Sequence, residues 1–168
     1  MNQKEKQRIG GVFKFELIRD GVKIDEWESD NIMTDEGLDY ELEVGVANGT
    51  QISTWYVGIF KGNYTPDGTE TGATIALDCT EATEYTAGTR QTYVPGAVAT
   101  QSVDNSASKA SFTINATVTI YGAFLAQDSA KNGTTGKALC ISRFPSQRDL
   151  VNTDELLVTY TLSAQDVV

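Results

Sequence analysis

Two runs of alternating apolar and polar residues, joined by an Asp-Gly pair, constrain this fold more than any other feature of the sequence. Alternation with a period of two places apolar side chains on one face of a β-strand. Asp20-Gly21 suits a tight turn that needs positive φ, so residues 11–28 are predicted to form a β-hairpin. The apolar members of the pattern are Phe13, Phe15 and Leu17 before the turn and Val22, Ile24 and Trp27 after it.

A second alternating run predicts a long strand at residues 110–121, with Ser and Thr opposite its apolar face. The apolar run at 54–60 is typical of a buried strand, and shorter strands are expected at 79–85, 89–94, 138–143 and 156–162. About eight strands without βα alternation indicate an all-β, antiparallel β-sandwich that is jelly-roll-like. The apolar face of the long strand comprises Phe112, Ile114, Ala116, Val118 and Ile120.

One short helix is predicted near residues 34–46. Thr34 is a suitable N-cap, and the acidic residues that follow it complement the helix dipole. Leu38, Leu42 and Val46 recur at helical spacing, so we expect them to form its buried face.

The first nine residues are polar and lack periodicity, so we interpret residues 1–9 as a flexible N-terminal arm and residues 10–168 as a single β-sandwich domain. Such an arm is either a frayed end or a clamp that orders on a neighbour. It contains no apolar signal-peptide core, which suggests synthesis in a cytoplasm. The loops at 61–72 and 128–137 are rich in Gly, Asn and Asp.

The net charge of −10 argues against nucleic-acid binding, because an acidic surface repels phosphates. The acids either solubilise the protein or face a basic partner. No apolar run approaches the ~20 residues of a membrane-spanning helix. Cys79 and Cys140 are expected to be buried thiols rather than a disulfide.

The sequence contains no pattern that assigns a catalytic or metal-binding site. The chain has no histidine, which removes the commonest general base and an ordinary zinc ligand. The acids near the hairpin and helix do not single out the facing carboxylate pair that a glycosidase needs. Asp67-Gly68 suits a turn better than a calcium site, because it lacks the alternating ligands of an EF-hand loop. We therefore expect neither a cofactor nor enzyme activity.

Aromatic residues offer a different class of function. Trp55, Tyr56 and Phe60 share one apolar strand, which favours core packing over a sugar-stacking platform. Tyr64 lies in a loop, where it suits an interface anchor. A carbohydrate-binding module therefore remains an alternative.

Two segments resemble small virion proteins of tailed bacteriophages. In the first, Asp30-Asn31-Ile32-Met33-Thr34-Asp35-Glu36-Gly37-Leu38 precedes Trp55-Tyr56-Val57-Gly58-Ile59-Phe60. In the second, a strand ending Gly122-Ala123-Phe124 is followed by a Gly-rich loop, a strand ending Ser142-Arg143-Phe144 and a closing strand at 154–160. The resemblance implies a non-enzymatic capsid cement (decoration) protein or a tail- or fibre-associated structural protein.

The same resemblance implies that the protein resides in the virion and contacts the major capsid protein or other virion proteins, as a homo-oligomer, without direct contact to nucleic acid or membrane. Cement proteins stabilise contacts between capsid subunits by burying loop and edge-strand surface, and an edge strand can also pair with a partner strand. The candidate interface residues are Lys4, Lys6, Arg8, Tyr64, Asp67, Lys131 and Lys137.

Overall fold

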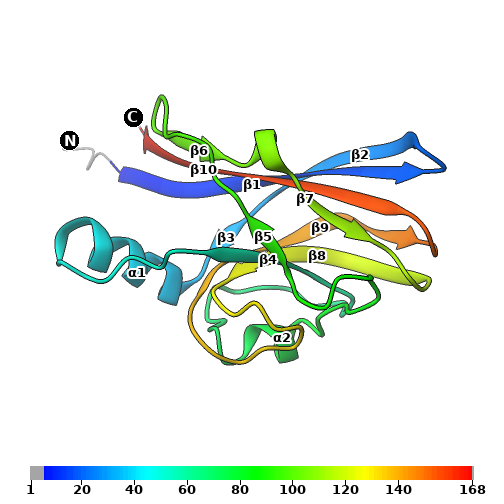
Figure 1. Cartoon of the computed structure of the whole chain (residues 1–168). Helices are drawn as coiled ribbons and strands as arrows, with labels where there is room; N and C mark the ends of the chain where they lie inside the picture. The colour runs from blue at the N-terminus through cyan, green and yellow to red at the C-terminus, as the bar shows by residue number, and fades with distance from the viewer. Residues whose placement is uncertain (1–5, 168) are drawn as a thin grey trace.

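Two antiparallel sheets pack face to face in a computed structural model that describes residues 6–167 (Figure 1). Two α-helices, α1 (Asp35–Val46) and α2 (Ile75–Asp78), and a 3-10 turn at Ser106–Ser108 complete the described elements. Sheet A has the order β2 (Val22–Asp30), β1 (Lys6–Arg19), β10 (Glu155–Val167) and β6 (Ser102–Asp104), with β7 (Ala110–Thr113) also paired to β10. Sheet B has the order β3 (Ile32–Met33), β9 (Ala138–Leu150), β8 (Val118–Ala126), β4 (Trp55–Phe60) and β5 (Gln91–Tyr93).

The predicted all-β sandwich with one short helix near its N-terminal end is confirmed. The last strand, β10, returns to lie beside β1 over its whole length, from Lys6 opposite Val167 to Ile18 opposite Glu155. Such a return to the first strand is typical of Greek-key sandwiches. Helix α2 is a single turn that no sequence pattern predicts.

The hairpin at the start of the chain is also confirmed. Asp20 and Gly21 have φ values of 52° and 77°, as a two-residue hairpin turn requires. The pairing of β1 with β2 shifts register between Leu17 and Ile18. Val22 and Ile24, on the turn side of this bulge, are exposed, and only Trp27 of the predicted apolar face is buried.

Residues 6–9 of the predicted flexible arm (residues 1–9) belong to a strand instead. β1 begins at Lys6, because the backbone of residues 6–9 continues the ladder to β10 as far as Val167. The sequence of this segment lacks apolar alternation, which is why it was predicted to be an arm. Its strand is defined instead by backbone hydrogen bonds to β10, which do not depend on the side chains. Residues 1–5 lie outside the described part of the chain.

The predicted long strand at 110–121 is two strands in different sheets. β7 pairs with β10 in sheet A, whereas β8 pairs with β4 and β9 in sheet B. The alternation persists across the break because both strands face the same core: Phe112, Ile114, Val118 and Ile120 are buried, and Ala116 at the crossover is exposed. The strand predicted at 79–85 is wrong, since that segment follows α2 and makes only isolated bridges.

Helix α1 forms where predicted, capped by the Thr34 hydroxyl, which accepts a hydrogen bond from the Gly37 N–H. Its predicted buried face is wrong. Leu38, Leu42 and Val46 are exposed, and the helix instead packs through Gly37 and Tyr40. A Cβ at Gly37 would lie 2.2 Å from the Leu139 carbonyl oxygen, so the helix backbone rests directly on β9.

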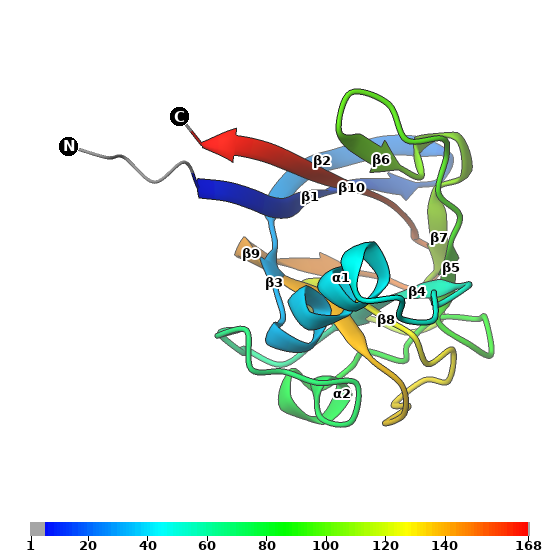
Figure 2. The same cartoon turned by 90° about the vertical axis from the view of Figure 1, so that its left-hand side faces the viewer.

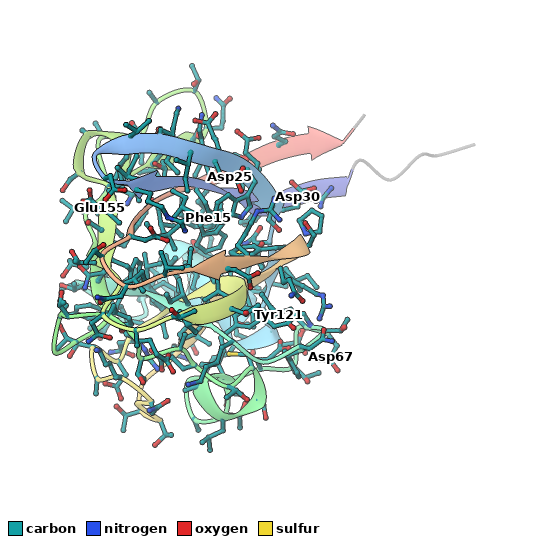
Figure 3. The ribbon with its side chains drawn as sticks, turned by 90° about the vertical axis from the view of Figure 1, so that its right-hand side faces the viewer. Phe15, Asp25, Asp30, Asp67, Tyr121 and Glu155 are labelled. Atoms are coloured by element: carbon teal, nitrogen blue, oxygen red, sulfur yellow. The ribbon has the colours of Figure 1, made fainter. Side chains whose placement is uncertain are left out.

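Two apolar clusters hold the sheets. The larger lies between them and contains stacked and edge-on aromatic pairs such as Phe15 with Trp27 and with Phe144. Figure 3 shows Phe15 pointing into this space and Tyr121 on the outer side of sheet B. The smaller cluster, around Phe60 and Phe124, lies between sheet B and α2. Cys79 and Cys140 are buried free thiols, one in each cluster, as predicted.

Candidate protein-interaction surface

The paired ends of β1 and β10 extend beyond their neighbours in sheet A as a two-stranded ribbon. β2 pairs with β1 only up to Asp30 opposite Val12, and β6 pairs with β10 only up to Ser102 opposite Ser163. We call residues 6–11 of β1 with 162–167 of β10 the terminal ribbon. Figures 1 and 2 show it projecting over α1, toward both chain ends.

Among residues 6–167, no strand pairs with one edge of the terminal ribbon, which leaves that edge open for backbone pairing. The Gly11 carbonyl accepts from the Asn31 N–H and the Gly11 N–H donates to Asn31 Oδ1, so Gly11 directs its backbone groups away from β10. The backbone N–H and C=O groups of successive residues in an antiparallel strand point to alternate sides. Gln7 and Ile9 therefore direct their N–H and C=O groups to the same side as Gly11, away from β10. β2 has ended there, and a shallow depression of about 200 Å³ lies beside Gly10 and Asp30. The position of Asp30 at the end of β2 is labelled in Figure 3.

An apolar groove lies beneath the terminal ribbon. A cavity of about 300 Å³ opens between α1, the chain before β4 and the inner face of β10. Its lining includes Val44, Ile52, Trp55 and Leu162, which pack against the main core and yet are only partly buried. The core of the sandwich is therefore left open at this end.

A second cavity of about 140 Å³ continues the groove under the ribbon. It is lined by Ile9, Leu162 and Ala164 on the inner face of the ribbon and by Val98 and Val103. Ile9 and Val98 are exposed. We refer to the two cavities together as the end groove. Contiguous exposed apolar surface of this kind is typical of interaction sites.

Glu41 lines both cavities, and it is the one charged side chain of the described residues that does so. It makes no ion pair with any side chain of residues 8–165, the part of the chain whose side chains the structure describes. Partial burial raises the pKa of the Glu41 carboxyl above its usual range. The groove therefore combines an apolar lining with an uncompensated, partly desolvated acid.

Three predicted interface residues belong to the N-terminal segment. Arg8 is exposed on the terminal ribbon and lines the depression beside Asp30. Lys6 begins β1, but its side chain lies outside the described part of the structure. Lys4 lies outside the described residues. The structure thus places Arg8 beside the open edge.

Tyr64 and Asp67 lie in the loop that precedes α2, and Figure 3 labels Asp67 there. The Tyr64 hydroxyl donates to Glu70 Oε1 at 2.8 Å, and the Asp67 and Gly68 N–H groups donate to the same buried carboxylate. Burial, with the Glu70 carboxylate beside it, raises the pKa of the Tyr64 hydroxyl. Asp67 is exposed, and the hydroxyl and N–H of Thr69 lower the pKa of its carboxyl. Tyr64 thus stabilises its own loop.

Lys131 and Lys137 lie in the Gly-rich loop between β8 and β9, and both have intramolecular partners. The Lys131 ammonium donates to the Thr83 and Tyr85 carbonyls and lies 3.8 Å from the centroid of the Tyr85 ring. Burial lowers the pKa of Lys131. Lys137 pairs with Glu43 of α1 at 3.5 Å. These two lysines, like Tyr64, contact other residues of the same molecule.

Sequence reasoning missed the end groove. Val44 and Ile52 come from α1 and the segment after it, whereas Val98 and Leu162 lie far away in the chain, and only the sandwich topology brings them together. The sequence predicts Trp55 in a buried strand, and its ring does pack edge-on against Tyr40, but its side chain stays partly exposed.

Metal ligands and membrane-spanning helices would point to other kinds of function. Within residues 6–167, no group of three or more His, Cys, Asp or Glu residues is placed to hold a metal ion. In the same part of the chain, neither helix has the length and hydropathy to cross a bilayer. No protein-family model and no curated protein matches the chain.

Proposed function

We propose that this protein is a non-enzymatic structural protein of a tailed-bacteriophage particle, and that it acts as a head decoration or cement protein. The observation that carries the proposal is the open end of the sandwich. There, backbone groups of β1 that no described strand pairs lie in the terminal ribbon, and the inner face of the same ribbon lines the end groove at Ile9. An open strand edge next to apolar surface suits docking against another protein, by strand addition and side-chain burial.

The two segments that resemble phage virion proteins support a phage particle as the assembly in which this protein docks. Both segments contribute to the end groove: the first contributes Trp55, and the second contributes Leu139 and Tyr160. The acidic surface, with a net charge of −10, suits contact with protein rather than with packaged DNA. A tail- or fibre-associated position uses the same docking surface and is the alternative.

Counting the protein in purified particles tests the proposal. Quantitative mass spectrometry of phage particles that contain this chain should find hundreds of copies, as repeated capsid subunits require. A dozen copies or fewer would support the tail position instead. Absence from the particle would refute both.

Adding the protein back to particles tests the docking surface. Particles that lack the protein should release DNA at a lower temperature, and purified protein should restore their stability. Ile9→Pro, at the open edge, should bind particles poorly, because proline removes a backbone donor. Leu77→Ser, on the exposed surface of α2 and away from the terminal ribbon (Figure 1), is the matched control and should bind normally.

A carbohydrate-binding module is favoured by one observation, the partly exposed Trp55 ring in the end groove. Aromatic rings stack on sugars as well as on protein side chains. Glycan-array binding by the wild-type protein that is lost in Trp55→Ala, with an unchanged circular dichroism spectrum, would establish this alternative.

A further inference from the structure

The end groove has the composition of a site for an apolar side chain. Four of the partly buried residues that flank the main core line it: Val44, Ile52, Trp55 and Leu162. Leaving such side chains in contact with water forgoes about 25 cal/mol per Å² of apolar surface that burial would contribute. An occupant that covers Trp55 and Leu162 would bury this surface.

The charges around the groove determine which occupant fits. Helix α1 carries five acidic residues and no Lys or Arg. Two of the five are used internally: Glu36 accepts from the Gly72 and Ala138 N–H groups, and Glu43 pairs with Lys137. Asp35, Asp39 and Glu41 make no ion pair among the described residues, and only Glu41 faces the groove.

A second copy of this chain docked through the same face is disfavoured. Two copies of α1 would bring like charges together, which costs free energy across an interface. A basic partner segment gains instead, because its cation would pair with a carboxylate that is already partly desolvated.

We propose that the end groove binds a segment of another protein that inserts an apolar or aromatic side chain against Trp55 and places an adjacent Lys or Arg against Glu41. This inference rests on the proposed docking function and adds the chemistry of the partner. The ion pair with Glu41 would make the contact specific for a basic segment. The cavity of about 300 Å³ would hold the apolar side chain that anchors the segment.

Selection from a random-peptide library on the purified protein tests this chemistry without a phage particle. Peptides eluted from the wild-type protein should be enriched in an aromatic or large aliphatic residue with a nearby Lys or Arg. Selection on Glu41→Lys should replace the basic residue by Asp or Glu. Asp39→Lys is the matched control on the exposed surface of the same helix, and it should return the wild-type consensus.

Binding of the best synthetic peptide then tests the location. Glu41→Gln should weaken its affinity about tenfold, as expected for loss of a desolvated charge pair, whereas Asp39→Asn should change it less than twofold. Trp55→Phe should abolish most of the tryptophan fluorescence change on binding, because Trp27 lies in the core. Failure to enrich any peptide, or a consensus unaffected by the charge at position 41, would overturn the inference. Either result would leave the copy-number test of the proposed function unaffected.

Discussion

At the scale of single residues, one buried ion pair organises the loops at the α2 side of sheet B. Arg90 and Glu81 are fully buried and form two hydrogen bonds, of 2.9 and 2.7 Å. Arg90 also donates to the Asp128 and Gly133 carbonyls, and the Asn132 N–H donates to Glu81. The pair thus fixes the Gly-rich loop to the segment after α2.

Removing one partner of this pair should be far more costly than removing a surface pair. Arg90→Met leaves the Glu81 charge buried without compensation, so we expect a loss of about 3–5 kcal/mol in the free energy of unfolding. Lys61→Met is the matched control, because the Lys61–Glu84 pair is partly exposed and should contribute about 1 kcal/mol or less. Urea titrations measure both. Equal losses in the two variants would contradict this role.

At the scale of elements, helix α1 is positioned by one glycine. Gly37→Ala places a methyl group 2.2 Å from the Leu139 carbonyl oxygen, so α1 must shift away from β9 and the protein should lose stability. A methyl group added at Gly45, on the same helix, would have no neighbouring atom within 4 Å. Gly45→Ala should therefore stabilise the protein by about 0.5–1 kcal/mol through helix propensity alone. Thermal unfolding should show shifts of opposite sign, and a gain in both variants would contradict the close packing.

The open edge of β1 gives a second prediction at this scale. Amide hydrogens of Gln7 and Ile9 should exchange with solvent faster than those of Arg8 and Gly10, which face β10. Ile9→Pro should leave exchange in the ladder to β10 unchanged, because it removes an unpaired donor. Arg8→Pro removes a donor to β10 and should accelerate exchange at Gly10. Exchange measured by NMR distinguishes the two, and equal disruption would refute the open edge.

Local sequence patterns predict where a strand or helix forms better than they predict which other elements it pairs with or packs against. Asp20-Gly21 and the capping Thr34 act within a few residues, so the hairpin and α1 were predictable. The continuous alternation through Ile114 could not reveal that the chain changes sheets there, because both strands face one core. The buried face of α1 was mispredicted because the Gly37 backbone contact, rather than a stripe of large apolar residues, determines how the helix packs.

At the scale of the whole molecule, the missing histidine and the paired carboxylates together determine the response to pH. Histidine is the side chain whose ordinary pKa lies between pH 5 and 8, and this chain has none. Its free energy of unfolding should therefore be nearly constant from about pH 6 to pH 8. Seven carboxyls of the described residues have pKa values below their usual range. Three of them are Asp154, held by Arg19; Asp128, held by Thr135; and Glu84, where the hydrogen bond from Lys61 and those from nearby N–H groups outweigh the effect of burial.

A lowered pKa in the folded state makes stability depend on the ionised carboxylate. Protons bind these groups more readily in the unfolded chain, so stability should be full above about pH 5 and fall progressively through pH 4 and below. Asp154 should contribute most to this loss of stability in acid. Its side chain is buried, accepts two 2.7 Å hydrogen bonds from Arg19 and also accepts one from the Val151 N–H.

Asp154→Asn tests this origin of acid sensitivity. The variant should be less stable than the wild-type protein at pH 7, and the difference should narrow as the pH falls, because acid removes the same charge from the wild-type protein. Asp39→Asn, at an exposed position on α1, is the matched control for the loss of one carboxylate charge. Urea unfolding at a series of pH values gives all three curves. If Asp154→Asn and the wild-type protein differed by a constant amount down to about pH 2, well below the ordinary carboxyl pKa, the Arg19–Asp154 pair would not be the source of acid lability.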